Sequence, residues 1–186
     1  MKPIHIIPLT DRKSSVREPQ LDALEHLAAT LARQFQTPCQ IRPETLDLSF
    51  ALDARRNQYY STAILQRLER NTAPEARVLG VTACDLYVPV LTFVFGEAQL
   101  EGHCAVVSTA RLHDEFYGLP PREDLLRARL VKEAAHEIGH TFGLRHCRDW
   151  RCVMASSHAV ERLDIKEADF CHACRTPIFR NGNFRP

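Results

Sequence analysis

The sequence predicts a single α/β domain, of the α+β kind, in which helices cover a mixed sheet. Three observations lead to this fold class. Segments with the apolar spacing of helices alternate with short β-branched runs along most of the chain. Two strand signals then follow each other closely before the last long helix, which is typical of a hairpin. With 186 residues and 45% apolar side chains, the chain is also long enough to bury one substantial core.

Five segments carry strand signals, because they are short and apolar or β-branched and have turn-forming residues nearby. The first is bounded by prolines, the second is weakened by Pro43, and a turn at Gly102 separates the last two. The five segments are Ile4–Leu9, Pro38–Phe50, Val78–Thr82, Thr92–Phe95 and Cys104–Thr109.

Three longer segments have apolar residues at helical spacing. They are Gln20–Gln36, Arg55–Arg70 and Pro121–Gly143. The third is expected to begin at Pro121, because a missing N–H costs nothing at a helix start, with Glu123 at the positive end of the helix dipole. We expect it to end at Gly143, and we expect the tail after Cys174 to be loose.

The end of this last helix carries the pattern H-E-x-x-H-x-x-G-x-x-H, from His136 to His146. Helical residues four apart differ by roughly 40° of rotation and about 6 Å of rise, so His136 and His140 can reach one metal ion from one face. Gly143 can adopt a left-handed conformation that turns the chain back and brings His146 to the same ion. The pattern predicts a catalytic zinc site, with Glu137 close enough to act on a zinc-bound water without being a ligand.

Four cysteines follow in two close pairs, Cys147 with Cys152 and Cys171 with Cys174. This spacing matches a closed tetrahedral structural zinc site. Unpaired buried thiols, a disulfide within the first pair and a redox-active second pair are the alternatives. Zinc is favoured because this part of the chain has few large apolar residues that could make it fold otherwise.

His146 and Cys147 are adjacent in the sequence. In an extended segment, successive side chains point to opposite sides, so His146 can face one ion while Cys147 faces the other. We therefore hypothesise that the structural zinc fixes the loop that holds the third histidine.

The histidine motif followed at once by Cys147, and then by Cys152, Met154 and the Cys171/Cys174 pair, resembles the archaemetzincins, a branch of the metzincin metalloproteases. The resemblance is specific over residues 136–174. It extends more weakly through Arg77–Tyr87 and Phe93–Leu112.

The resemblance implies a metzincin-like fold, with a mostly parallel mixed sheet, one antiparallel edge strand, an active-site helix below a cleft, and a small C-terminal lobe held by zinc. We expect one catalytic domain over residues 1–186. Residues 1–143 would form its N-terminal subdomain with the sheet and the active-site helix. Residues 144–186 would form its C-terminal subdomain with the four-cysteine zinc site and the methionine turn.

The resemblance also implies roles for individual residues. Glu137 would be the general base and acid, and Met154 the methionine of the turn beneath the catalytic metal. Ser156 stands where certain other metzincins have a tyrosine ligand, so a tyrosine-assisted mechanism is not supported. The cofactor would be two Zn²⁺ ions, a catalytic one bound by His136, His140 and His146 and a structural one bound by Cys147, Cys152, Cys171 and Cys174.

We therefore expect a zinc-dependent peptidase that hydrolyses peptide bonds in peptides or small proteins. Thr92–Glu97 is either the edge strand against which an extended peptide pairs or an ordinary strand. Ala155–His158 is expected to form a wall of the pocket for the residue after the scissile bond. The alternative function is a catalytically weak or silent zinc-dependent module that binds peptides or proteins. Glu137 favours the enzyme, because a binding role does not need a carboxylate there.

Composition excludes other partner classes. The formal net charge is +1 and no basic stripe interleaved with aromatics is present, so we expect no nucleic-acid partner. No stretch approaches the roughly 18 apolar residues of a membrane span, so we expect no membrane partner. The first residues lack the pattern of a signal peptide, which favours a cytoplasmic protein. We expect a monomer.

Overall fold

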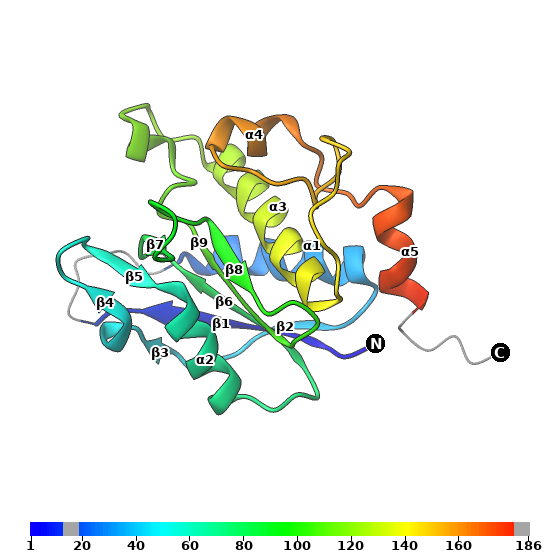
Figure 1. The fold of residues 1–186 in the computed structure, drawn as a ribbon, viewed down its shortest axis with the longest axis horizontal. Helices are drawn as coiled ribbons and strands as arrows, with labels where there is room; N and C mark the ends of the chain where they lie inside the picture. The colour runs from blue at the N-terminus through cyan, green and yellow to red at the C-terminus, as the bar shows by residue number, and fades with distance from the viewer. Residues whose placement is uncertain (13–18, 181–186) are drawn as a thin grey trace.

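A mostly parallel sheet lies at the centre of the structure, a computed structural model that describes residues 1–12 and 19–180 (Figure 1). The strand order is β2-β1-β6-β9-β8, and β3 also pairs with β1. The strands are β1 (Ile4–Thr10), β2 (Cys39–Ile41), β3 (Leu46–Asp47), β6 (Arg77–Thr82), β8 (Gly96–Ala98) and β9 (Cys104–Ser108). Only the pairing of β8 with β9 is antiparallel within this sheet of the described residues, so the expected antiparallel edge strand is confirmed.

Helices cover both faces of the sheet (Figure 1). On one face lie α1 (Leu21–Phe35) and α3 (Glu123–Thr141). On the other lie α2 (Ser61–Asn71), the short 3-10 helix η1 (Ser49–Ala51) and a small sheet of β4 (Leu52–Asp53), β5 (Gln58–Tyr60) and β7 (Leu86–Tyr87). The chain after α3 adds α4 (Val160–Ile165) and α5 (His172–Arg180), and a second 3-10 helix, η2 (Asp114–Tyr117), precedes α3.

The central strands have two buried faces, because successive side chains of a strand point to opposite sides. On β9, Ala105 and Val107 pack in the core beneath α1 and α3, whereas Cys104 and Val106 pack beneath α2. All five residues of β9 are buried. This explains why the strand is a continuous apolar run in the sequence.

The prediction of a strand at Thr92–Phe95 is wrong by a few residues. The edge strand is β8, and within Thr92–Phe95 only Val94 forms a single bridge, to Leu86. The reason is that backbone carbonyls at the start of this segment accept hydrogen bonds from side chains and not from a neighbouring strand. The Arg56 guanidinium donates to the carbonyls of Leu91 and Thr92, and the Gln58 amide also donates to Thr92.

Three other boundaries differ from those predicted. The helix expected over 55–70 begins only at Ser61, because Asn57 has a positive φ of 53° and residues 58–60 form β5. The helix expected from Pro121 begins at Glu123, two residues later. The tail after Cys174, expected to be loose, continues as α5 to Arg180, and Ile178 within it is buried. Residues 181–186 lie outside the described part.

None of the helices in the described ranges, 1–12 and 19–180, is both long and apolar enough to span a bilayer.

Arg77, the first residue of β6, caps the C-terminus of α3. Its Nη1 atom donates to the carbonyl oxygen of Thr141 at 2.8 Å, to the hydroxyl of Thr141 at 3.0 Å and to the carbonyl of Gly102 at 3.1 Å. The guanidinium lies 3.6 Å from the ring centroid of Phe142. Arg77 is half-buried, and a cation at the negative end of a helix dipole stabilises that helix.

The Arg77→Met variant should therefore lower the free energy of unfolding by about 2 kcal/mol, because the three acceptors lose a charged donor and the helix end loses its cation. Urea denaturation of the zinc-loaded protein measures this. Arg70→Met is the control, since Arg70 is an exposed arginine in the last turn of α2. Equal effects of the two substitutions would contradict the capping role.

Candidate metal centres

The structure brings the three histidines of the motif together. His136 and His140 lie one turn apart on α3, and the chain turns back at Gly143, which has a φ of 86°. His146 then returns to the first two. The ring centroids are 4.7 Å apart for His136 and His140, 5.3 Å for His136 and His146, and 5.1 Å for His140 and His146. One ring nitrogen from each histidine lies within 4.8 Å of the others.

Hydrogen bonds fix the tautomers of two of these rings. The Nδ1 atom of His136 lies 2.8 Å from the carbonyl oxygen of Val153, and that of His140 lies 2.7 Å from the carbonyl oxygen of Leu144. Because a carbonyl oxygen can only accept, both Nδ1 atoms donate, and in the neutral rings both Nε2 atoms carry a lone pair.

These two lone-pair nitrogens face each other at 3.1 Å. Two acceptors cannot hydrogen-bond to each other, whereas a cation between them would satisfy both lone pairs. Nitrogens bound tetrahedrally at the usual Zn–N distance of about 2.0–2.1 Å are about 3.3 Å apart. The histidine cluster therefore fits a zinc ion.

Burial keeps the imidazoles neutral. It lowers the pKa of His136 well below its ordinary value, and it also lowers the pKa values of His140 and His146. Burial is the largest cause for each ring, because a desolvated imidazolium is disfavoured. Neutral imidazole is the form that binds metals, so the three rings are in their ligand form at pH 7.

Glu137 lies beside the histidine cluster, and its carboxylate packs against β8. A Cβ atom added at Gly96 would lie 2.7 Å from Cγ and 2.9 Å from Oε1 of Glu137. Glu137 is 5% exposed, and burial together with the neighbouring Glu133 raises the pKa of its carboxyl well above the ordinary value. Glycine at position 96 therefore leaves the space that this carboxylate occupies.

The Gly96→Ala variant should lower kcat by about 100-fold, because a carboxylate displaced by roughly 1 Å no longer meets the reacting groups. Peptide cleavage assays measure the change. Zinc content serves as the control and should stay close to that of the wild type, whereas the melting temperature should fall, because the added Cβ atom would also lie 2.7 Å from the backbone carbonyl oxygen of Val106. Unchanged kcat would show that the position of Glu137 does not depend on this contact.

Met154 lies directly beneath the same helix. A Cβ atom added at Gly139 would lie 2.5 Å from the sulfur of Met154. Met154 is fully buried, and a tight turn joins the Ala155 N–H to the carbonyl of Cys152 at 2.9 Å. Met154 thus lies in a tight turn against α3, and this contact depends on a glycine in the middle of the motif.

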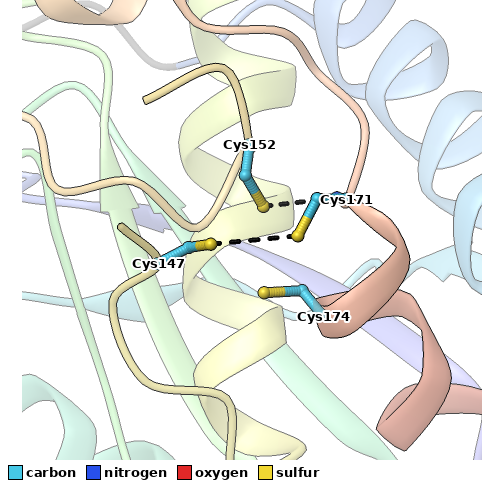
Figure 2. Close-up of side chains that lie close together, drawn as sticks. All are labelled: Cys147, Cys152, Cys171 and Cys174. Carbon is cyan, nitrogen blue, oxygen red and sulfur yellow. Dashed lines mark hydrogen bonds between the residues drawn. The ribbon is translucent and has the colours of Figure 1, made fainter. Parts of the chain in front are cut away.

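The four cysteines form a second cluster, with their side chains turned toward one another (Figure 2). Their sulfur atoms lie within 4.8 Å of one another, and all four are free thiols. The sulfurs of Cys147 and Cys171 are 3.8 Å apart, too far for the roughly 2.0 Å of a disulfide. Sulfurs on a tetrahedral zinc, at the usual Zn–S distance of about 2.3 Å, are about 3.8 Å apart. This cluster also fits a zinc ion. Cys174 lies on α5, and Cys171 is the residue just before α5 begins.

Backbone hydrogen bonds connect the two clusters. The N–H of Cys147 donates to the carbonyl of Met154 at 2.9 Å, and the N–H of Cys171 donates to the sulfur of Cys152 at 3.3 Å. Val153, whose carbonyl holds His136, in turn donates its N–H to the carbonyl of Asp169 at 3.0 Å. The segment between the cysteines therefore positions a histidine of the other cluster.

Two depressions flank the histidine cluster, and both are lined by His136, Glu137, His146 and Gly96. One, of about 250 Å³, lies between the segment 91–96 and the residues Ser156, Ser157 and His158. The other, of about 540 Å³, extends along β8 toward Leu100. Ser156, Ser157 and His158, which follow Met154, thus form a wall of the first depression.

Sequence reasoning missed a buried ion pair, of which Glu133 lines the first depression. Lys166 donates to Oε1 of Glu133 at 3.2 Å and to the carbonyl of Ala155 at 3.3 Å, and both charged side chains are buried. Glu133 lies one turn before His136, a spacing that could have drawn attention to it. Nothing in the local sequence around Lys166 indicates its long-range partner.

Comparisons with known proteins agree with this geometry. The family model described as "Peptidase family M54" matches residues 25–180. The archaemetzincin of Methanocaldococcus jannaschii is 47% identical over 144 residues, covering 77% of this chain and 79% of its own. The crystal structure of archaemetzincin from Archaeoglobus fulgidus, complexed with malonate, has a TM-score of 0.78 and 38% identity and covers 94% of this chain and 99% of its own.

A third similar protein is a zinc-dependent peptidase from Methanocorpusculum labreanum. Its crystal structure has a TM-score of 0.80 and 31% identity, and the match covers 94% of this chain and 99% of that one. Both the family model and the 47% identical relative span most of the chain. The chain therefore belongs to peptidase family M54, the archaemetzincins, and is a zinc metallopeptidase.

Proposed function

We propose that this peptidase hydrolyses peptide bonds of extended peptides or small proteins, with Glu137 as the general base and acid. In this proposal His136, His140 and His146 hold a catalytic zinc. A second, structural zinc is held by Cys147, Cys152, Cys171 and Cys174.

One observation carries the proposal: two imidazoles, each locked by a backbone carbonyl, direct unprotonated Nε2 atoms at each other across 3.1 Å. His146 is the exposed member of the cluster and lines both depressions. The ring nitrogens therefore meet at the floor of a cleft that a substrate can enter, whereas purely structural zinc sites are closed.

Zinc held by these three histidines would supply Lewis-acid chemistry, lowering the pKa of a water molecule toward about 7 and polarising a carbonyl group. Glu137 lies at the same cleft floor and accepts the proton of the attacking water. The same carboxyl then donates the proton to the departing amine.

The edge of β8 offers backbone groups to the substrate. Phe95 accepts a hydrogen bond from the N–H of Ser108, and Gln99 donates its N–H to the carbonyl of Cys104. Because alternate residues of an antiparallel strand bond to the partner strand, Gly96 and Ala98 direct their backbone groups to the other edge, toward the cleft. An extended peptide can add to this edge. Of the two interpretations of Thr92–Glu97, we favour the edge strand that pairs with a peptide, and we assign this role to β8, which overlaps that segment at Gly96 and Glu97.

Removal and return of the metal tests the proposal. The purified protein is incubated with a diverse peptide mixture in three states: as isolated, after chelation, and after chelation followed by added Zn²⁺. Mass spectrometry identifies the products. We expect cleavage in the first and third states only. Absence of cleavage by the zinc-loaded protein, with zinc content verified, would favour the zinc-dependent binding module instead.

A further inference from the structure

Five large apolar side chains are exposed in two segments of the chain, one of which reaches the cleft at Leu91. They come from two segments, the loop between β7 and β8 and the region of η2, and we name them together the apolar rim: Val90, Leu91, Phe116, Tyr117 and Leu119. Val90 is 89% exposed and Leu119 is 52% exposed. Large exposed apolar side chains that gather on a soluble protein mark interaction sites.

One arginine joins the two segments of the rim. The guanidinium of Arg111 lies 4.2 Å from the ring centroid of Phe93 and 4.6 Å from that of Phe116. Asp85 holds this guanidinium with two hydrogen bonds, at 2.7 and 2.8 Å. A planar guanidinium fixed in this way stacks on aromatic faces, so Phe93, Arg111 and Phe116 form a rigid stack.

The η2 region is anchored to the core while its apolar side chains face outward. Asp114 is buried and bonded to Arg129, itself 3% exposed, at 2.8 Å, and Arg122 also bonds to Asp114. The hydroxyl of Tyr117 donates to the carbonyl of Arg111 at 3.0 Å. The exposure of Phe116 and Tyr117 is therefore held in place by a buried ion-pair network and is not that of a loose loop.

The rim is continuous with the cleft. Leu91 belongs to the rim and also lines the depression beside the histidine cluster. Phe93 lines the same depression, contacts Phe95 at a centroid distance of 5.2 Å and stacks on Arg111. A chain that leaves the cleft past Leu91 therefore meets the rim next.

The direction of the substrate follows from β8. Antiparallel strand pairing is slightly more stable than parallel pairing. A peptide that is antiparallel to β8 runs from the Leu100 end of the cleft to the Leu91 end. The residues that follow the scissile bond then reach the rim.

We propose that the apolar rim is a substrate-binding surface outside the cleft, which takes apolar and aromatic side chains from the C-terminal part of a polypeptide substrate. This rests on the proposed function, because that function places an extended polypeptide in the cleft. The rim makes the enzyme prefer long substrates with apolar residues well beyond the cleaved bond.

Matched peptides test the rim. The core is a short peptide that the wild type cleaves in the mixture experiment, and it is extended at its C-terminus by Gly-Phe-Gly-Phe or by Gly-Ser-Gly-Ser. The wild type should show kcat/KM about tenfold higher for the phenylalanine tail than for the serine tail. The Phe116→Ala/Leu119→Ala variant should lose this difference and cleave the unextended core as the wild type does. Phe50→Ala is the control. Phe50 is also exposed, at 40%, and also stacks against an arginine, Arg67, but it lies on the α2 face of the sheet.

A binding arm separates failure of the rim from failure of the proposed function. The Glu137→Ala protein, loaded with zinc, is titrated with fluorescein-labelled forms of the same peptides, and anisotropy gives Kd. If the wild type cleaves no peptide in the mixture experiment, an alanine-rich peptide takes the place of the core peptide. If the phenylalanine tail binds more tightly than the serine tail, and this difference depends on Phe116 and Leu119, the result supports the rim even when no peptide is cleaved. Equal Kd and kcat/KM for both tails, or a preference only for tails added at the N-terminus, would overturn it.

Discussion

The Glu137→Ala variant is expected to lose about 10²–10⁴-fold in kcat while it keeps its zinc. Glu137 is not one of the three residues whose ring nitrogens converge, so its removal leaves the metal ligands in place. It removes the only carboxylate among the described residues that lines both depressions beside the histidines, and with it the proton acceptor for the attacking water. Initial-rate kinetics on a cleaved peptide, with zinc content measured on the same samples, check this result.

Glu97→Gln is the matched control. Glu97 also lines one depression, but its carboxylate accepts hydrogen bonds from the hydroxyls of Ser61 and Thr62 at the start of α2. It is thus engaged with the protein, and its replacement should change kcat by less than about tenfold. A Glu137→Ala enzyme that retains near wild-type kcat would rule out the proposed role of this carboxylate.

The Cys171→Ser variant should lose metal from both clusters. A structural zinc site contributes its binding free energy to folding, so loss of one thiolate should lower the free energy of unfolding by several kcal/mol, of the order of 3–5. The histidine cluster should then bind zinc more weakly, because Val153, which holds His136, is bonded to Asp169 only two residues before Cys171. Competition with a chromogenic chelator measures the affinity of each class of site.

Cys39→Ser serves as the control for thiol loss, since Cys39 lies on β2 and belongs to neither cluster. It should leave both zinc affinities unchanged. If the Cys171→Ser protein binds zinc at the histidines as tightly as the wild type, the two clusters are not mechanically coupled.

The sequence is most informative where periodicity and spacing carry the physics. The apolar stripe of Leu24, Leu27 and Leu31 predicts α1, and all three side chains are buried. The motif spacing predicts which ring nitrogens meet and where the chain turns back, at Gly143. Both signals are local, since helical geometry alone connects these residues.

Long-range contacts are beyond the reach of sequence patterns. The edge strand is predicted a few residues too early because its position depends on Arg56 and Gln58, which bond to the carbonyls before it. Likewise, the carbonyl of Val153 holds a histidine seventeen residues earlier in the chain. The helix α5 is missed because cysteine and polar residues give it little apolar periodicity, although it begins next to Cys171.

Anomalous scattering from crystals of the zinc-loaded protein, recorded on both sides of the zinc absorption edge, tests the central claim most directly. The account predicts two peaks per chain, one between the Nε2 atoms of His136 and His140 and within reach of His146, and one among the four cysteine sulfurs. A peak among the sulfurs with none between the histidines, or rings that diverge in the crystal, would contradict it.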